Sequence, residues 1–478
     1  MQYLENISTK NSYLLLLVIS TLSGIIFLHT ELNYNSDAII SSVALAISNT
    51  IAENTFRFHY LLPGFKANGG FTHYLHWPPL SYWLLAIWLK FVANSLLSAR
   101  IFILIFKIAS DIFLLKYLNS NNDNISQNLF VCIIFCLIPF RMNYLDLIFG
   151  DSLVLLFIIS TLYFYQKNNT ILLTICSMAG ILCSWYFGIF VFGFTLFKLT
   201  QKDFNKLTII LVCTTFFTLI AWVVYVFYAK NLVQTFHYQT NNTHNTTQNS
   251  FFNQFSSYSG LAILNGNFKI SLALKWILKF ATEVTLLTLC LSALPQSYRN
   301  SLNAYFQGFT IGFVSLFLVL PVFFMIHSHN IYFLSLGISI YISSKIHLKS
   351  IYYSIILLPV FTFLISKFEF QNLETKQRDE WIAEQINKNN YKFTFINNPG
   401  FQTINRQFMY TPWWVMYNTE TKLFERLGNY DTKLDFIQKT KAPKENTIIF
   451  STTKLDSNFT LINSFKEIYC YKIEKNNF

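Results

Sequence analysis

Two aspartates, Asp37 and Asp151, are the residues of this sequence best suited to take a proton from a hydroxyl group. Each lies beside an apolar run, in the segments "YNSDAII" and "FGDSLVLLF". A carboxylate that borders a cavity can act there as a general base. A second interpretation stays open for both, because an aspartate at the beginning of a helix also serves as an N-cap.

Further polar side chains are expected to face the same side as these two acids, at the outer boundary of a membrane. Carboxylates, imidazoles, guanidinium groups and tyrosines are all represented: Glu31, Glu53, Arg57, His59, His73, His76, Tyr82, Arg100, Arg141, His327, His329 and Tyr332. Arginine and histidine bind phosphate, and the carboxylates supply a base, so the set suits an anionic substrate with a large apolar part. The two histidines of "HSHN" could form a metal pair. Further ligands are not evident, so a divalent metal is not supported and no cofactor is expected to be required.

The composition indicates a polytopic membrane protein. Of the 478 residues, 53% are hydrophobic and 12% are charged, whereas a soluble domain carries about 25% charged residues. The net charge of +12 is attributed to Lys and Arg in cytoplasmic loops, so membrane lipids and not nucleic acid are the expected partners. The first apolar run lacks a cleavage-site pattern and is expected to remain as an anchor.

Eleven apolar stretches are candidates for membrane-spanning helices. They are residues 12–28, 99–118, 128–148, 152–166, 170–184, 186–200, 207–229, 272–293, 304–325, 331–344 and 350–366. The stretch 186–200 is short, so 170–200 could be one hairpin that does not cross fully. Lys and Arg lie at alternate ends of these stretches, which predicts a cytoplasmic N-terminus. The expected location is a bacterial inner membrane.

The apolar run Leu80–Leu89 decides the topology. It is too short to cross a bilayer, and Lys90 follows it. Counting it as a crossing would place every later loop on the opposite side of the membrane. We therefore expect a helix that lies along the outer interface within the loop 29–98, with Trp83 and Trp88 at headgroup depth.

Two acids, Asp111 and Glu283, fall in the middle of predicted spans, where a charge is costly. Lys107 and Lys279 lie four residues before them on the same helix faces. Structural ion pairs within each helix are therefore expected in preference to a catalytic role.

After Lys367 the composition changes. Charges become frequent, and three strand-like runs, "KFTFIN", "NTIIFS" and "EIYCYKI", follow the helical pattern "ETKQRDEWIAEQINK". Residues 1–366 are thus expected to form the membrane domain, and residues 367–478 a small soluble α/β domain on the outer, extracytoplasmic side.

In their order and spacing these segments resemble the GT-C superfamily of membrane glycosyltransferases, in particular the relatives of protein O-mannosyltransferases and lipid A aminoarabinose transferases. The similarity covers the N-terminal half best. It comprises the acid after the first span (Asp37), "HWPPLSYW" about forty residues later, the span start "SARIFILIF", the acid of "FGDSLVLLF" (Asp151) and the late turn "HSHNIYFL". A soluble C-terminal domain also occurs in members of that superfamily.

The resemblance implies an enzyme that moves a sugar, with inversion, from a polyprenyl-phosphate donor to a hydroxyl of a glycan, lipid or protein acceptor at the outer membrane face. Asp37 would be the general base, and Asp151 the second acid. The superfamily places Lys or His before Pro-Pro-Leu to meet the donor phosphate; Trp77 stands there, so His76 is expected to take that role. The other expected site residues are Arg100, His327 and His329 at the phosphate and Glu31, Glu53, His73, Tyr82 and Tyr332 around the cavity.

Two other functions remain open on the residues alone. A transporter or lipid-linked sugar flippase would use ionisable groups near the bilayer midplane, and it should tolerate neutralisation of Asp37. A membrane scaffold would bind partners through its outer domain and would lack a large cavity near the first outer loop.

Overall fold

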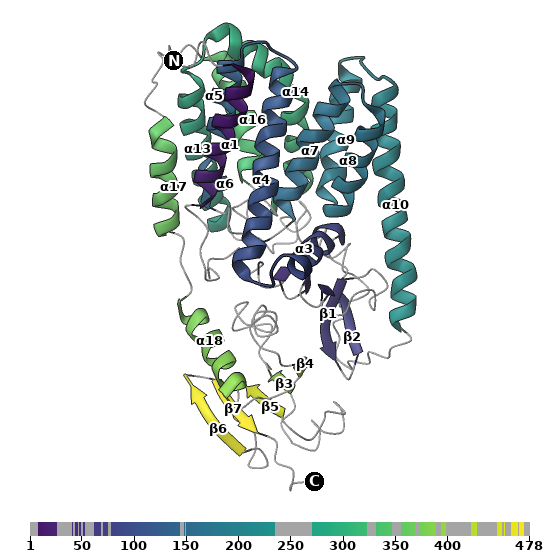
Figure 1. The fold of residues 1–478 in the computed structure, drawn as a ribbon, viewed down its shortest axis with the longest axis vertical. Helices are drawn as coiled ribbons and strands as arrows, with labels where there is room; N and C mark the ends of the chain where they lie inside the picture. The colour runs from purple at the N-terminus through teal and green to yellow at the C-terminus, as the bar shows by residue number, and fades with distance from the viewer. Residues whose placement is uncertain are drawn as a thin grey trace.

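The described helices within residues 1–368 form a bundle, and one helix with a five-stranded sheet follows in the chain (Figure 1). The structure is a computed structural model of the 478-residue chain. It describes residues 8–25, 41, 44, 45, 47, 48, 51, 52, 62–67, 70–74, 78–143, 148, 150–234, 270–322, 331–346, 355–368, 373–388, 393–397, 422–427, 447–451, 454, 460–466 and 468–472.

Each of the eleven apolar stretches contains a helix. In chain order these helices are α1 (Thr9–Ile25), α4 (Leu96–Asn119), α5 (Ile125–Cys136), α7 (Asp151–Gln166), α8 (Thr170–Cys183), α9 (Tyr186–Thr200), α10 (Lys206–Gln234), α13 (Ile270–Leu291), α14 (Gln296–Val319), α16 (Ile331–Lys345) and α17 (Leu357–Phe368). The bundle is apolar on its outside as well as inside: Leu14, Phe217 and Leu278 are all more than half exposed. Helices that are apolar on every side suit a lipid environment.

Length and composition alone single out two helices of the described part as able to cross a membrane, Lys206–Tyr225 and Gln296–Val319. Other apolar helices, α8 and α9 among them, are shorter. The helical bundle is thus as expected, while the number of full crossings stays a prediction.

Helices α1 and α4 are antiparallel neighbours. Ser20 Oγ of α1 donates a hydrogen bond to Asp111 of α4, and Lys107 Nζ donates to Ser23 Oγ at 2.7 Å. The later residue of α1 thus contacts the earlier residue of α4, so the two helices run in opposite directions. The chain between them, residues 26–95, leaves and re-enters the bundle at the same end, so it makes no net crossing.

The turns that carry Lys and Arg meet at the other end of the bundle. Ser120, after α4, donates to Gln166 at the end of α7 at 2.8 Å, and Tyr298 of α14 donates to Asn128 of α5 at 2.6 Å. Further hydrogen bonds at this end join Tyr165 to Thr208 and Arg299 to Ser343. The ends of α4 and α7 and the beginnings of α5, α10 and α14 therefore lie at one end of the bundle.

Helix α3 (Leu80–Phe91) lies oblique to the long helices, at the end of the bundle next to a β-hairpin (Figure 1). Its 12 residues span about 18 Å, less than the roughly 30 Å of a bilayer core. The Trp88 indole donates to the Ser98 carbonyl at 2.9 Å and fixes α3 to the beginning of α4. Its exposed residues include Ile87, Lys90 and Phe91, a composition that suits the interfacial helix expected here.

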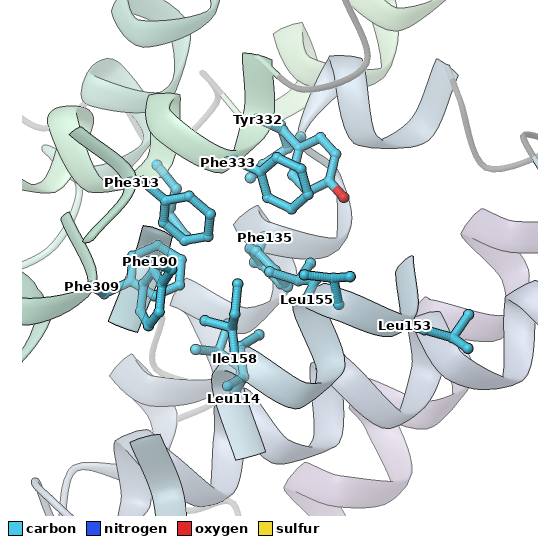
Figure 2. Close-up of a cluster of buried hydrophobic side chains, with 14 of the residues drawn as sticks. Leu114, Phe135, Leu153, Leu155, Ile158, Phe190, Phe309, Phe313, Tyr332 and Phe333 are labelled. Carbon is cyan, nitrogen blue, oxygen red and sulfur yellow. The ribbon is translucent and has the colours of Figure 1, made fainter. Parts of the chain in front are cut away.

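Close approach at a glycine lets aromatic rings of α9, α14 and α16 interlock in the core (Figure 2). A Cβ on Gly312 would lie 2.5 Å from the ring of Phe190. Phe313 stacks on Phe333 with ring centroids 5.2 Å apart, and the ring of Tyr332 lies beside Phe333 with centroids 4.4 Å apart. This packing fixes the first turn of α16, where Tyr332 lies.

Strands β1 (Leu62–Ala67) and β2 (Gly70–Tyr74) form the antiparallel hairpin beside α3, with Pro63 opposite His73. Strand β1 also contacts β4 of the C-terminal sheet. The hairpin and the C-terminal sheet therefore meet at this end of the molecule.

The C-terminal elements are α18 (Leu373–Lys388), β3 (Phe393–Asn397), β4 (Lys422–Leu427), β5 (Thr447–Ser451), β6 (Thr460–Phe465) and β7 (Ile468–Lys472). The strand order is β4-β3-β5-β7-β6; β3 pairs parallel with β4 and β5, and β7 pairs antiparallel with β5 and β6. Trp381 of α18 stacks on Phe465 at 5.6 Å, and Phe450 and Cys470 are buried. The helix and the three strands expected from the sequence are present, and the sheet has two further strands, β4 and β6.

Candidate functional site

A short helix, α6 (Pro139–Asn143), precedes the beginning of α7 and is held by two buried carboxylates. Glu283 of α13 accepts a hydrogen bond from the backbone N–H of Phe140 at 2.9 Å and another from Ser335 Oγ of α16. On the next residue of α6, Arg141 Nη1 lies 2.6 Å from Asp111 Oδ1 of α4. Both contacts are closed to water, which strengthens them electrostatically.

These contacts correct two expectations. Arg141 was expected among the cations of the outer boundary, but it is 4% exposed and pairs with Asp111 inside the bundle. The expected pair of Asp111 with Lys107 is present, at 3.8 Å. Among the described residues, however, no ion pair joins Glu283 to Lys279, whose Nζ lies over the ring of Phe140 at 5.4 Å.

The first outer loop is tied to the chain that leads into α7. Ser41 Oγ accepts a hydrogen bond from the backbone N–H of Ile148 at 2.9 Å. Ser41 belongs to a group of helical residues with a buried face, namely Ser41, Ala44, Leu45, Ile47, Ser48 and Ile51. The pattern of residues after Asp37 predicts an amphipathic helix from about Ser36 on the membrane surface, and the apolar residues of this group belong to the hydrophobic core of the bundle.

The Pro-Pro segment meets the same place from another side. A Cβ on Gly150 would lie 3.2 Å from Ser81 Oγ and 3.4 Å from the carbonyl oxygen of Cys183. Ser81 is in the first turn of α3, two residues after Pro79, and Cys183 is the last residue of α8. Gly150 thus lets α3, α8 and the beginning of α7 come into contact.

Asp151 is the first residue of α7, and Gly150 is the N-cap, without a capping side chain. The N-cap interpretation of Asp151 is therefore wrong by one residue. An acid in the first turn still suits the positive end of the helix dipole. Its position leaves the catalytic interpretation open.

Three other expected site residues lie in described, buried positions. Arg100 is in the second turn of α4 and 1% exposed, Tyr82 is on the buried side of α3, and Tyr332 begins α16 beside Phe333. His73 is in β2 of the outer hairpin. Six expected residues lie outside the described part: Glu31, Asp37, Glu53, His76, His327 and His329.

Ser41, Ser81 and Gly150, which join the segments of the site, were not singled out in the sequence. Serine and glycine are common, and their role appears only through tertiary contacts. The sequence does indicate that Glu283 and Asp111 have partners, because an acid in the middle of a predicted span needs one. The i−4 spacing named Lys279 as the partner of Glu283, whereas the real partners are 143 and 52 residues away.

In sequence, the chain matches no protein-family model and no curated protein. In structure it is similar to ArnT from Cupriavidus metallidurans bound to undecaprenyl phosphate, with a TM-score of 0.50 and 10% identity over 98% of this chain and 99% of that one. The apo state of the same protein gives a TM-score of 0.47 and 10% identity over 97% and 98%. The Archaeoglobus fulgidus oligosaccharyltransferase tethered to an acceptor peptide gives 0.46 and 11% over 93% and 69%.

The similarity to the first of these structures extends over nearly the whole of both chains, although identity is only 10%. It therefore concerns the overall fold and not which side chains are present. At that level the resemblance read from the sequence is confirmed: this chain shares its fold with the ArnT structure.

Proposed function

We propose that this chain is a membrane glycosyltransferase that moves a sugar from a polyprenyl-phosphate donor to an acceptor hydroxyl at the outer face of the membrane. The GT-C fold supports this class of reaction, and the similar ArnT structure holds undecaprenyl phosphate. Function still has to rest on the site, because one fold can host many activities.

The observation that carries the proposal is the meeting of three sequence segments at one end of the bundle. Ser41, four residues after Asp37, binds the backbone of Ile148. Ser81, in the helix that follows "HWPP", contacts Gly150. Both contacts lie within three residues of Asp151. Segments that are far apart in the chain, each with expected site residues, thus converge where α7 begins.

The proposed reaction is a single displacement at the anomeric carbon. Asp37 takes the proton from the acceptor hydroxyl, and the oxygen then attacks from the face opposite the phosphate. The bond between the anomeric carbon and the phosphate oxygen breaks, and polyprenyl phosphate leaves with the bonding electrons. Inversion follows from the single attack. Asp151 is proposed as the second acid, which orients the acceptor or the sugar.

The leaving phosphate gains charge as the bond breaks, so cationic groups should stabilise it. We assign this role to His76, Arg100, His327 and His329, with Glu31, Glu53, His73, Tyr82 and Tyr332 around the cavity. A phosphate is already a good leaving group, and the proposed reaction therefore requires no metal or other cofactor. The acceptor is a glycan, a lipid or a protein.

The side of the membrane follows from the charge distribution. The Lys- and Arg-bearing turns gather at one end, and the proposed site lies at the other with α3 and the hairpin. By the positive-inside rule the first end is cytoplasmic. We therefore place the site and the domain after Lys367 on the extracytoplasmic side of a bacterial inner membrane.

The test is an assay of the purified full chain in lipid nanodiscs with radiolabelled polyprenyl-phosphate sugars and a panel of acceptors. Wild-type protein should transfer label to at least one acceptor, and Asp37→Asn should bind the donor without transfer. A transporter or flippase would instead move the intact donor across proteoliposome membranes and tolerate Asp37→Asn. Absence of both transfer and donor binding for every donor would reject the proposal.

A further inference from the structure

The chain from α6 to the first residue of α7 is attached to the bundle at four places. Glu283 binds the Phe140 N–H, and Asp111 binds Arg141. Ser41 then binds Ile148, and Gly150 packs on Ser81. We propose that Glu283 and Arg141 are positioning residues that fix α6 and thereby the place of Asp151 in the active site. This inference rests on the glycosyltransferase function proposed above.

Helix α6 cannot hold its position by itself. It has five residues, and one turn of helix is not stable without tertiary contacts. Pro139 is the first residue of α6. Because proline has no backbone N–H, it cannot continue the hydrogen bonds of α5, and the two helices are separate. The orientation of α6 must therefore come from side chains of neighbouring helices.

Glu283 supplies one of these contacts in a form that no apolar residue could replace. Its carboxylate is 0% exposed and bridges the Phe140 N–H of α6 and the Ser335 hydroxyl of α16. The N–H of Phe140 is in the first turn of α6, where backbone donors have no partner within the helix. A buried carboxylate is costly unless hydrogen bonds satisfy it, and here each hydrogen bond ties a separate element to α13.

Arg141, the residue after Phe140 in α6, supplies the second contact. Its guanidinium binds Asp111 at 2.6 Å and the Phe135 carbonyl at 3.1 Å, and it lies over the Phe135 ring at 4.0 Å. The end of α5, the middle of α4 and α6 are thereby joined through one side chain. Removal of Asp111 would leave the buried Arg141 without a carboxylate partner, and removal of Arg141 would leave Asp111 with Lys107 at 3.8 Å and the Ser20 hydroxyl.

Glu283 and Asp111 are also the two acids that a transporter would use for coupling. The proposed positioning role therefore has to be distinguished from proton transfer. A proton carrier must change its charge, whereas a positioning residue must only accept hydrogen bonds. Glutamine has the size of glutamate and cannot titrate; its amide oxygen can accept from the Phe140 N–H while its NH2 group donates to the Ser335 hydroxyl. Glu283→Gln therefore preserves positioning, and Glu283→Leu removes it.

The experiment compares the full chain in nanodiscs as wild type, Glu283→Gln, Glu283→Leu and Arg141→Met. Steady-state transfer gives kcat and the KM for the donor. A second readout does not depend on transfer: the rate at which a membrane-impermeant maleimide labels a cysteine introduced by Ser152→Cys, with Cys213→Ser in every variant because Cys213 is exposed. Tyr298→Phe is the matched control, since it removes a buried 2.6 Å hydrogen bond to Asn128 at the opposite end of the bundle.

Displacement of a catalytic group by a small distance costs about a hundredfold in rate. Glu283→Leu and Arg141→Met should therefore lower kcat by about that factor with little change in KM, and raise the labelling rate about tenfold as the start of α7 loosens. Glu283→Gln and Tyr298→Phe should stay within about twofold of wild type in both readouts. If Glu283→Leu does not fold, Ser335→Ala removes one of the two donors to Glu283 and should give an intermediate effect.

Equal loss of transfer in Glu283→Gln and Glu283→Leu would overturn the proposal, because the charge itself would then be needed. Wild-type labelling rates in Glu283→Leu and Arg141→Met would overturn it as well. If the wild type transfers no sugar, the proposed function fails, and the labelling rates still decide whether these residues fix the start of α7.

Discussion

The hydroxyl of Ser41 accepts a hydrogen bond from the backbone of Ile148 at 2.9 Å, across 107 positions of the sequence. Through this contact the helical residues that follow Asp37 are joined to the chain that leads to Asp151. Two carboxylates whose roles could only be guessed from the sequence thus belong to segments that are held together. The predictions below test this arrangement.

Neutralisation of Asp151 should affect catalysis more than folding. Its position in the first turn of α7 contributes at most about 1 kcal/mol through the helix dipole, and Gly150, not Asp151, is the N-cap. For Asp151→Asn we expect a thermal unfolding temperature near that of wild type and a loss of transfer of about 10²–10⁴-fold. Comparison with Ser152→Ala controls for a change at the helix start; a large loss of stability in Asp151→Asn alone would point to a structural role.

Removal of the Ser41 hydroxyl should destabilise the outer end of the bundle. Ser41→Ala leaves the buried N–H of Ile148 without its acceptor, at a cost of about 1–3 kcal/mol. Thermal unfolding of the detergent-purified protein measures this loss. The control is Ser177→Ala, because the Ser177 hydroxyl only donates to the Leu173 carbonyl of its own helix at 2.7 Å. Equal unfolding temperatures for the two variants would contradict the proposed tie.

Addition of a methyl group at Gly150 should push α3 away from α7. The backbone φ of −64° suits any residue, so the effect of Gly150→Ala is steric: its Cβ would approach Ser81 Oγ to 3.2 Å. We expect about 1–3 kcal/mol of destabilisation. The double variant Ser81→Ala/Gly150→Ala removes the obstructing oxygen and should recover part of the loss. Additive effects of the two substitutions in a thermal-unfolding cycle would contradict this contact.

The C-terminal sheet should lose stability at alkaline pH. Burial raises the pKa of the Cys470 thiol in β7 to about 12, above the value of about 8.5 for an unfolded chain. The folded form therefore holds this proton more tightly. Its contribution to stability is complete below about pH 8.5 and is lost progressively as the pH rises toward 12.

Alkylation of Cys470 by iodoacetamide, followed by mass spectrometry, tests this expectation. At pH 8 the thiol should react only after denaturation, because it is both buried and protonated. Cys470→Ser should leave a shallower loss of stability between pH 8.5 and 10.5. Fast alkylation of native protein at pH 8 would show that the strand is open.

The helix positions could be predicted because they depend on local hydrophobicity. The length of the run Leu80–Leu89 and Lys90 set it apart from the predicted spans, and the helix found there has 12 residues. The structure supports that decision through an independent observation, the antiparallel contacts of Ser20 with Asp111 and of Ser23 with Lys107. These contacts return the chain to the same end of the bundle before α4 begins.

The partners of buried charges could be predicted only where they lie on the same helix. The spacing of four residues correctly predicts Lys107 as a partner of Asp111, but Arg141, which is grouped with the cations of the outer boundary, pairs with Asp111 from another helix. Glu283 was given Lys279, while its hydrogen bonds come from Phe140 and Ser335 on other helices. A period of 3.6 residues describes neighbours within one helix and carries no information on which helices pack together.

The central claim is that the chain breaks the bond between a sugar and a polyprenyl phosphate and gives the sugar to an acceptor. A single-turnover reaction with a donor labelled separately in sugar and lipid measures both products at once. We predict that wild-type protein releases free polyprenyl phosphate and glycosylated acceptor in equal amounts, and that Asp37→Asn binds the donor but releases neither. Release of polyprenyl phosphate without a glycosylated acceptor, or equal turnover by Asp37→Asn, would contradict the account.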